Sequence, residues 1–137
     1  MPVDALVLAV DPASPSVART FVAGLLRRRG YDPGLVEDAE LMVSELATNV
    51  VVHVGEPFTV AVNEVERGVC VSVEDPSSTL PVLRAPDSAA EGGRGLRIVE
   101  ALAAEWGALV LEHGGKTVWF VASPSAASPA TSIPTEG

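Results

Sequence analysis

Apolar positions in the first part of the chain follow a strand period and then a helical period. The apolar run 5–10 (ALVLAV) is short and ends at an Asp-Pro pair, which predicts a strand. From Ser14 onward, apolar residues recur every three to four positions until Gly30, which predicts a first helix. Ser14 is a typical N-cap residue and Pro15 suits the first helical position, so we expect Ser14 to cap this helix.

A second helix begins with the same signal, because Asp32 can cap it and Pro33 fits its first position. Its apolar period predicts a helix that runs to about His53–Val54. Two segments rich in β-branched residues follow, 58–63 (FTVAVN) and 69–75 (VCVSVED), and turn residues separate them. This pattern predicts a β-hairpin.

The second half of the chain opens with a long irregular stretch, 75–95, rich in proline, glycine and small polar residues. Loops of this length inside compact domains are usually functional or disordered. Segment 95–106 then predicts a third helix with Trp106 on its buried side, ended by Gly107. Segment 108–122 contains two β-branched runs around a His-Gly-Gly turn, which predicts a second hairpin.

The predicted order is β-α-α-β-β-loop-α-β-β. It indicates an α+β fold, a two-layer α/β sandwich in which helices cover one face of a mainly antiparallel sheet. A length of 137 residues suits one domain with one core. We assign that domain to residues 1–122 and expect the Ser/Pro/Ala-rich stretch 123–137 to be a disordered tail.

Charge and composition narrow the class of ligand. The formal net charge is −9, and the only basic run, Arg27–Arg29, lies at a predicted helix end, where the macrodipole favours cations. Counterion release drives nucleic-acid binding, so we expect no direct nucleic-acid contact and favour a partner protein or an anion compensated by Mg²⁺. The sequence has no long apolar run, no basic export signal and one cysteine, Cys70. We therefore expect a cytoplasmic protein with no membrane contact, intrachain disulfide or thiolate metal cluster.

Three polar side chains recur at four-residue spacing in the second predicted helix: Glu45, Asn49 and His53, in the segment ELATNVVVH. At about 100° per residue, His53 falls inside the apolar arc, and Glu45 and Asn49 fall on its edge. An unpaired polar group there is costly. One interpretation is a structural hydrogen-bond network. The other is a functional site in which Asn49 binds Mg²⁺ and Glu45 deprotonates a nucleophile.

Two further features allow both a functional and a structural interpretation. The glycines of 92–96 (GGRGL) stand where the long loop enters the third predicted helix, and such a helix start suits a phosphate. The structural alternative is a flexible loop end. Asp75 ends a predicted strand just before the loop, where its carboxylate can accept from an exocyclic amine or cap the following turn.

In their order along the chain, these features resemble the histidine-kinase-like ATPase superfamily. Within it they are similar to the small bacterial anti-sigma-factor serine kinases. The segment 41–53 (LMVSELATNVVVH) resembles the N-box, 71–78 (VSVEDPSS) the first glycine box, 92–107 (GGRGLRIVEALAAEWG) the second glycine box, and 115–120 (GKTVWF) the closing strand. The resemblance covers roughly residues 12–122 and implies the Bergerat-type ATP-binding sandwich.

The resemblance also implies roles for individual residues. Asn49 would coordinate Mg²⁺ at the ATP phosphates, and Glu45 would be the general base. Asp75 would receive the adenine amino group, and Thr117 would lie beside the adenine near Asp75. We expect Lys116, in the predicted hairpin, to be exposed.

The phosphate site would come from the second glycine box. Gly93 and Gly95, with the backbone N–H groups from Arg94 to Leu96, would hold the phosphates. The Arg94 side chain would touch a phosphate or be an exposed loop arginine. The stretch Pro76–Gly92 would be the lid over ATP.

The resemblance implies an ATP-dependent serine/threonine protein kinase. It would phosphorylate a small anti-anti-sigma (STAS-type) protein, bind a sigma factor and switch between the two, and homodimers are common in the family. The alternative is a non-catalytic module that binds ATP or no nucleotide and sequesters a partner. Ser77, where the family carries glycine, and a short lid favour it. The ATPase half of a two-component histidine kinase is less favoured, because no dimerisation helix pair with a phospho-accepting histidine precedes the first predicted helix.

Overall fold

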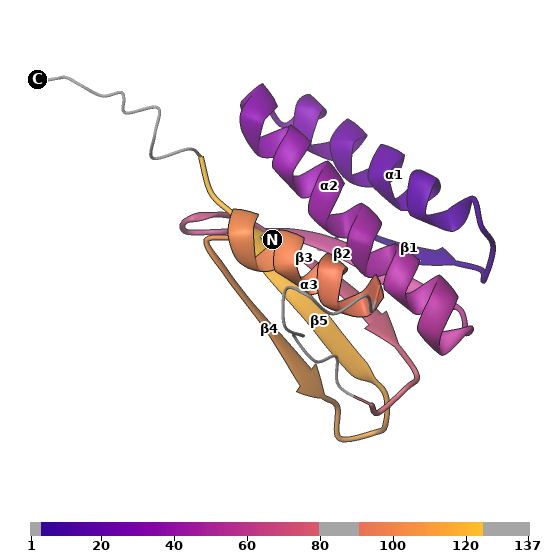
Figure 1. Cartoon of the computed structure of the whole chain (residues 1–137). Helices are drawn as coiled ribbons and strands as arrows, with labels where there is room; N and C mark the ends of the chain where they lie inside the picture. The colour runs from indigo at the N-terminus through magenta and orange to yellow at the C-terminus, as the bar shows by residue number, and fades with distance from the viewer. Residues whose placement is uncertain (1–3, 80–90, 125–137) are drawn as a thin grey trace, which may run out of the picture.

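The computed structural model of the protein describes residues 4–79 and 91–124. These residues form two layers, one antiparallel sheet with the helices packed on one of its faces (Figure 1). The strand order across the sheet is β1-β2-β3-β5-β4, and each neighbouring pair is antiparallel. The predicted fold class and element order are therefore confirmed. The elements are β1 (Asp4–Leu8), α1 (Ser14–Arg28), α2 (Pro33–Asn49), η1 (Val50–Val54), β2 (Phe58–Val65), β3 (Gly68–Asp75), α3 (Glu91–Leu102), β4 (Glu105–Val110) and β5 (Lys116–Ala122).

The two helix starts that look alike in sequence are built differently. At α2 the Asp32 carboxylate accepts a hydrogen bond from the Leu35 N–H at 3.1 Å, as predicted for an N-cap. At α1 the cap position belongs to Ala13, whose side chain makes no cap bond, so the prediction for Ser14 is wrong. The Ser14 hydroxyl instead donates to the Ala9 carbonyl at 2.7 Å and ties the helix to the end of β1.

The core lies between the sheet and the helices, and the strand register assembles it. Alternate residues of β2, β3 and β5 point to the helix side, and directly opposed residues share that face, as the pleat requires. Val71 pairs with Phe120 and Val73 with Val118, and all four are buried. The helices complete this core with fully or nearly fully buried residues that include Leu26, Met42, Val43, Leu46, Leu96 and Val99.

The third helix ends earlier than its sequence period predicts. It ends at Leu102, and the chain joins the sheet directly afterwards, because the Ala104 N–H donates to the Val121 carbonyl at 2.8 Å. Trp106, predicted on the helix, is a β4 residue paired with Phe120. Gly107, predicted to end the helix, is also in β4, and a Cβ there would lie 2.7 Å from the Trp119 ring. This glycine therefore makes room for the Trp119 indole on the face of the sheet away from the helices.

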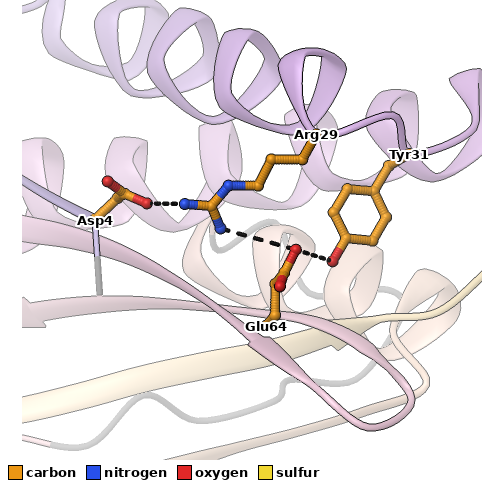
Figure 2. Close-up of polar contacts among 4 residues, drawn as sticks. All are labelled: Asp4, Arg29, Tyr31 and Glu64. Carbon is orange, nitrogen blue, oxygen red and sulfur yellow. Dashed lines mark hydrogen bonds and ion pairs between the residues drawn. The ribbon is translucent and has the colours of Figure 1, made fainter. Parts of the chain in front are cut away.

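An ionic cluster joins the end of α1 to the sheet (Figure 2). The Arg29 guanidinium ion-pairs with Asp4 of β1 and lies 3.9 Å from the Glu64 carboxylate of β2. The Tyr31 hydroxyl donates to the same Glu64 carboxylate at 3.1 Å. Burial, and then the hydrogen bond to Glu64, raise the pKa of Tyr31. The last arginine of the basic run is thus occupied by protein carboxylates.

Candidate functional site

The residues singled out in the sequence gather at one end of the molecule. The C-terminal end of α2, the end of β3 and the start of β5 lie there together with the start of α3 (Figure 1). Helix α2 packs against α3 and against the neighbouring strands β3 and β5, so it faces this part of the sheet across the core. Chain connectivity explains this placement, because η1 leads through a short turn into β2, and the start of β2 pairs with the end of β3.

Glu45 and Asn49 lie one helical turn apart on α2, and both side chains are partly buried. Within residues 4–79 and 91–124, neither side chain makes a hydrogen bond or an ion pair. A structural hydrogen-bond network at the helix edge therefore does not account for them. Partly buried polar groups without protein partners are available to a ligand.

His53 does not continue this line. The helical period predicts it inside the apolar arc, but its side chain is exposed, so that prediction is wrong. The α-helix changes directly after Asn49 into the π-helical turn η1, in which the Gly55 N–H bonds to the Val50 carbonyl at 2.8 Å. A π-helical turn includes one more residue than an α-helical turn, so side chains beyond Val50 are rotated about the axis. Gly55 then ends the helix in a left-handed conformation, with φ +71°.

Asp75, the last residue of β3, is buried and points to the helix side like Val71 and Val73 before it. Its Oδ1 accepts a hydrogen bond from the Ser77 N–H at 2.8 Å, so the carboxylate caps the following turn. Its Oδ2 is buried and has no hydrogen bond. The side chain therefore has a structural role through Oδ1, and Oδ2 can still accept a hydrogen bond on the core side of the sheet.

The neighbour of Asp75 differs from the one that the sequence analysis expected. Register pairs Asp75 with Lys116 and places Thr117 opposite Glu74. Lys116 is buried, with its Nζ 3.1 Å from Oδ1 and 3.0 Å from Oδ2 of Asp75, so the expectation of an exposed lysine is wrong. Thr117 lies on the opposite, helix-free face, in a shallow groove with Cys70 and Trp119. Thr117 is therefore not beside Asp75.

Gly115 allows β5 to start this close to Asp75. It has a left-handed backbone, with φ +86°, and a Cβ at this position would lie 2.7 Å from the Asp75 carbonyl oxygen. Only glycine combines this conformation with such a close approach to another backbone. The turn before β5 thus sets the distance between the two strands at the site.

The second glycine box lies inside a helix rather than before it. Because α3 begins at Glu91, Gly93, Arg94 and Gly95 belong to its first turns. The first N–H groups of a helix have no intrahelical acceptor, which keeps this segment suited to an anion. The Leu96 side chain is fully buried in the core, so only its backbone is available to a ligand. The expected lid, Pro76–Gly92, lies outside the described residues from 80 to 90.

The oxygen donors at this end suit a hard cation that brings its own ligands. Carboxylate and carboxamide oxygens bind Mg²⁺, which keeps several waters and phosphate oxygens in its shell. No group of three or more His, Cys, Asp or Glu side chains within the described part of the chain is placed to hold a metal ion. The residues therefore fit a Mg²⁺ that arrives with a polyphosphate, and they do not form a cage of their own.

Comparisons with known proteins agree with this fold. The family model of the histidine kinase-like ATPase domain matches residues 8–122. Among solved structures, the chain is similar to a crystal structure of the RsbU and RsbW domains of Rv1364c from Mycobacterium tuberculosis. The TM-score is 0.66 and the identity 22%, and the match covers 88% of this chain and 32% of that one. This chain thus spans about a third of the length of the chain in that structure.

No curated protein matches the sequence. In the parts of the chain that the structure describes, every helix is too short or too polar to cross a membrane. The family match spans most of the chain and includes each element that contributes to the site. The protein therefore belongs to the histidine kinase-like ATPase domain family, which implies ATP as its nucleotide.

Proposed function

We propose that the protein is an ATP-dependent serine/threonine kinase that phosphorylates a small anti-anti-sigma (STAS-type) protein and also binds a sigma factor. The observation that carries the proposal is the pair Glu45 and Asn49, partly buried and without protein partners at the end of the molecule where Asp75 lies. The similarity to a structure that contains an RsbW domain supports the fold, and the N-box and glycine-box resemblance supports the kinase class.

In the proposed mechanism this chain's residues position the reactants. The Asn49 amide oxygen would hold Mg²⁺, which would supply positive charge to the phosphate oxygens. Glu45 accepts the proton of the substrate serine hydroxyl as its oxygen bonds to the γ-phosphorus. The bond from that phosphorus to the β–γ bridging oxygen breaks, and ADP leaves. Positioning and charge stabilisation supply most of the catalysis in phosphoryl transfer.

In the proposed nucleotide complex, different residues bind the base and the phosphates. Asp75 accepts the adenine amino group, and the backbone of Gly93, Arg94, Gly95 and Leu96 holds the phosphates at the start of α3. Glycine at two of these positions lets a phosphate approach the backbone closely. A homodimer remains a prediction of the family resemblance, and cytoplasmic localisation remains a prediction of the sequence composition.

The kinase reaction is tested by phosphate transfer from ATP labelled with ³²P at the γ-phosphate to purified candidate STAS-type proteins. We expect Glu45→Gln and Asn49→Ala each to lower the rate at least a hundredfold, because each removes a group from the reacting centre. Glu37→Gln is the matched control, since Glu37 is exposed on the same helix. Equal rates for Glu45→Gln and Glu37→Gln would contradict the assigned base.

A second candidate function is a non-catalytic module that binds a partner, with or without ATP. The turn at Ser77 favours it, because this residue replaces the family's glycine and its N–H is held against Asp75. In this case wild-type protein transfers no phosphate to any candidate serine. Glu45→Gln and Asn49→Ala then bind the sigma factor as wild type does, which pull-down with purified partners measures.

A further inference from the structure

Lys116 and Asp75 form an ion pair that differs from the others in the molecule. Their side chains are 7% and 1% exposed. In every other ion pair among the described residues, both side chains are at least 25% exposed. The cross-strand pairs that precede it on the same face, Val73–Val118 and Val71–Phe120, are apolar. One charged pair therefore ends an otherwise apolar row at the proposed nucleotide end.

Stability alone does not explain such a pair. Taking two charges out of water costs several kcal/mol for each ion, and replacing a buried ion pair by packed apolar residues is often neutral or stabilising. A valine pair at this position would continue the row that already builds the core. The charges stand at the ends of two strands that pack against α2, the helix that carries Glu45 and Asn49, and this placement suggests that they serve a ligand.

The hydrogen bonds of the pair are incomplete. Asp75 Oδ1 accepts from the Ser77 N–H and from Lys116, whereas the buried Oδ2 accepts no well-aligned hydrogen bond and lies 3.0 Å from the Lys116 Nζ. The Lys116 ammonium has three donors, and within the described residues it makes one hydrogen bond, to Asp75. Oδ2, which within the described residues has the ammonium 3.0 Å away as its close polar neighbour, can accept a further hydrogen bond, and the ammonium has donors to spare. Both groups are held in place by the fold.

We propose that Lys116 is a specificity-determining residue that reads adenine together with Asp75, an inference that rests on the proposed ATP binding. Asp75 Oδ2 accepts from the exocyclic N6 amine, and the Lys116 ammonium donates to the adjacent ring nitrogen N1. Adenine presents this donor and acceptor side by side on its Watson–Crick edge. The ammonium keeps its contact with Oδ1, so the base completes the hydrogen bonds without separating the charges.

The same arrangement rejects guanine. In the same placement, guanine has a carbonyl oxygen where adenine has the amine, and an N–H where adenine has N1. The carbonyl oxygen would meet the Asp75 carboxylate, and the N–H would meet the ammonium. Each contact leaves a buried polar group unpaired, and such mismatches give strong discrimination between similar ligands.

The inference is tested with nucleotide analogues on the wild-type chain by isothermal titration calorimetry in Mg²⁺ buffer. 1-Deaza-ATP lacks N1 and keeps the N6 amine, whereas 7-deaza-ATP lacks a ring nitrogen that Lys116 does not contact. A hydrogen bond to a charged group corresponds to about a 10- to 100-fold change in affinity. We expect 1-deaza-ATP to bind at least tenfold more weakly than ATP, and 7-deaza-ATP to bind like ATP.

Variants at Lys116 assign the effect to this residue. Lys116→Met keeps the length of the side chain and removes its charge, and it should lower ATP affinity about tenfold and no longer distinguish ATP from 1-deaza-ATP. Lys116→Arg retains a donor and should recover part of the difference. Circular dichroism checks that each variant folds. If Lys116→Met does not fold, the comparison of nucleotide analogues on the wild-type protein still tests the inference.

Two results would overturn the role of Lys116 while leaving ATP binding intact. One is equal affinity of wild type for ATP and 1-deaza-ATP. The other is tighter ATP binding by Lys116→Met, which would mean that the lysine competes with the base for Asp75. The absence of saturable binding by any of the three nucleotides is a different result, because it refutes the proposed ATP binding itself.

Discussion

The turn before β5 gives a prediction whose magnitude follows from the backbone geometry. Gly114 and Gly115 are adjacent, and both have left-handed backbones, with φ +97° and +86°. A Cβ on Gly114 would have nothing within 4 Å, whereas a Cβ on Gly115 would lie 2.7 Å from the Asp75 carbonyl oxygen and 3.3 Å from the Pro76 Cα. Gly114→Ala therefore measures backbone strain alone, and Gly115→Ala adds a contact with a neighbouring strand.

The two contributions have different sizes. Alanine in a left-handed conformation costs about 1–2 kcal/mol, which both variants share. A contact that forces a packed backbone to move costs about a further 1–3 kcal/mol. We expect Gly114→Ala to lose about 1–2 kcal/mol of unfolding free energy and Gly115→Ala about 2–5 kcal/mol.

Urea denaturation followed by circular dichroism measures both values. With a slope of about 2 kcal/mol per molar urea, the two midpoints should differ by roughly 0.5–1.5 M. Because the displaced carbonyl belongs to Asp75, Gly115→Ala should also weaken ATP binding, and Gly114→Ala should leave it unchanged. Equal midpoints for the two variants would refute the conclusion that the close approach at Gly115 positions the site.

Three further outcomes test other parts of the structure. Lys116→Met alone should destabilise the fold by about 3–5 kcal/mol, since it leaves the Asp75 carboxylate buried and unpaired; adding Asp75→Asn should restore most of this in urea titrations, and no recovery would contradict the buried pair. Asp32→Ala should cost about 1 kcal/mol by the same assay, because it removes the α2 cap. Burial, and then the charge of Glu105, raise the pKa of the Cys70 thiol, so its thiolate forms at higher pH than in a free cysteine. Iodoacetamide should therefore modify the native chain more slowly than the urea-unfolded chain at pH 8, and equal rates would argue against this burial.

Local signals predicted the elements well because each acts within a few residues. The cap at Asp32 and the break at Gly55 need only the neighbouring backbone, and both are present. The predicted end of α3 was wrong because Trp106 fits a helical period as well as it fits a strand paired with Phe120. Pairing with β5 is a tertiary interaction, and a sequence window around Trp106 does not contain it.

The same distinction between local and tertiary signals applies to the residues of the site. Glu45 and Asn49 lie on one helix, so their spacing alone places them one turn apart. The partner of Asp75 depends on strand register, and a shift of one residue exchanges the two faces of a strand. That single residue separates Thr117, which faces away from the helices, from Lys116, which faces Asp75. The buried lysine was therefore not predictable from sequence spacing alone.

The strand order has a consequence for how the protein is made. β5 follows the other described strands in sequence, yet it lies inside the sheet between β3 and β4. During synthesis one edge of β3 therefore stays unpaired until β5 is available. An unpaired edge of a valine-rich strand can form hydrogen bonds with other chains. Asp75 also lacks its lysine until β5 has joined the sheet, so the nucleotide end is complete only after nearly the whole domain has been synthesised.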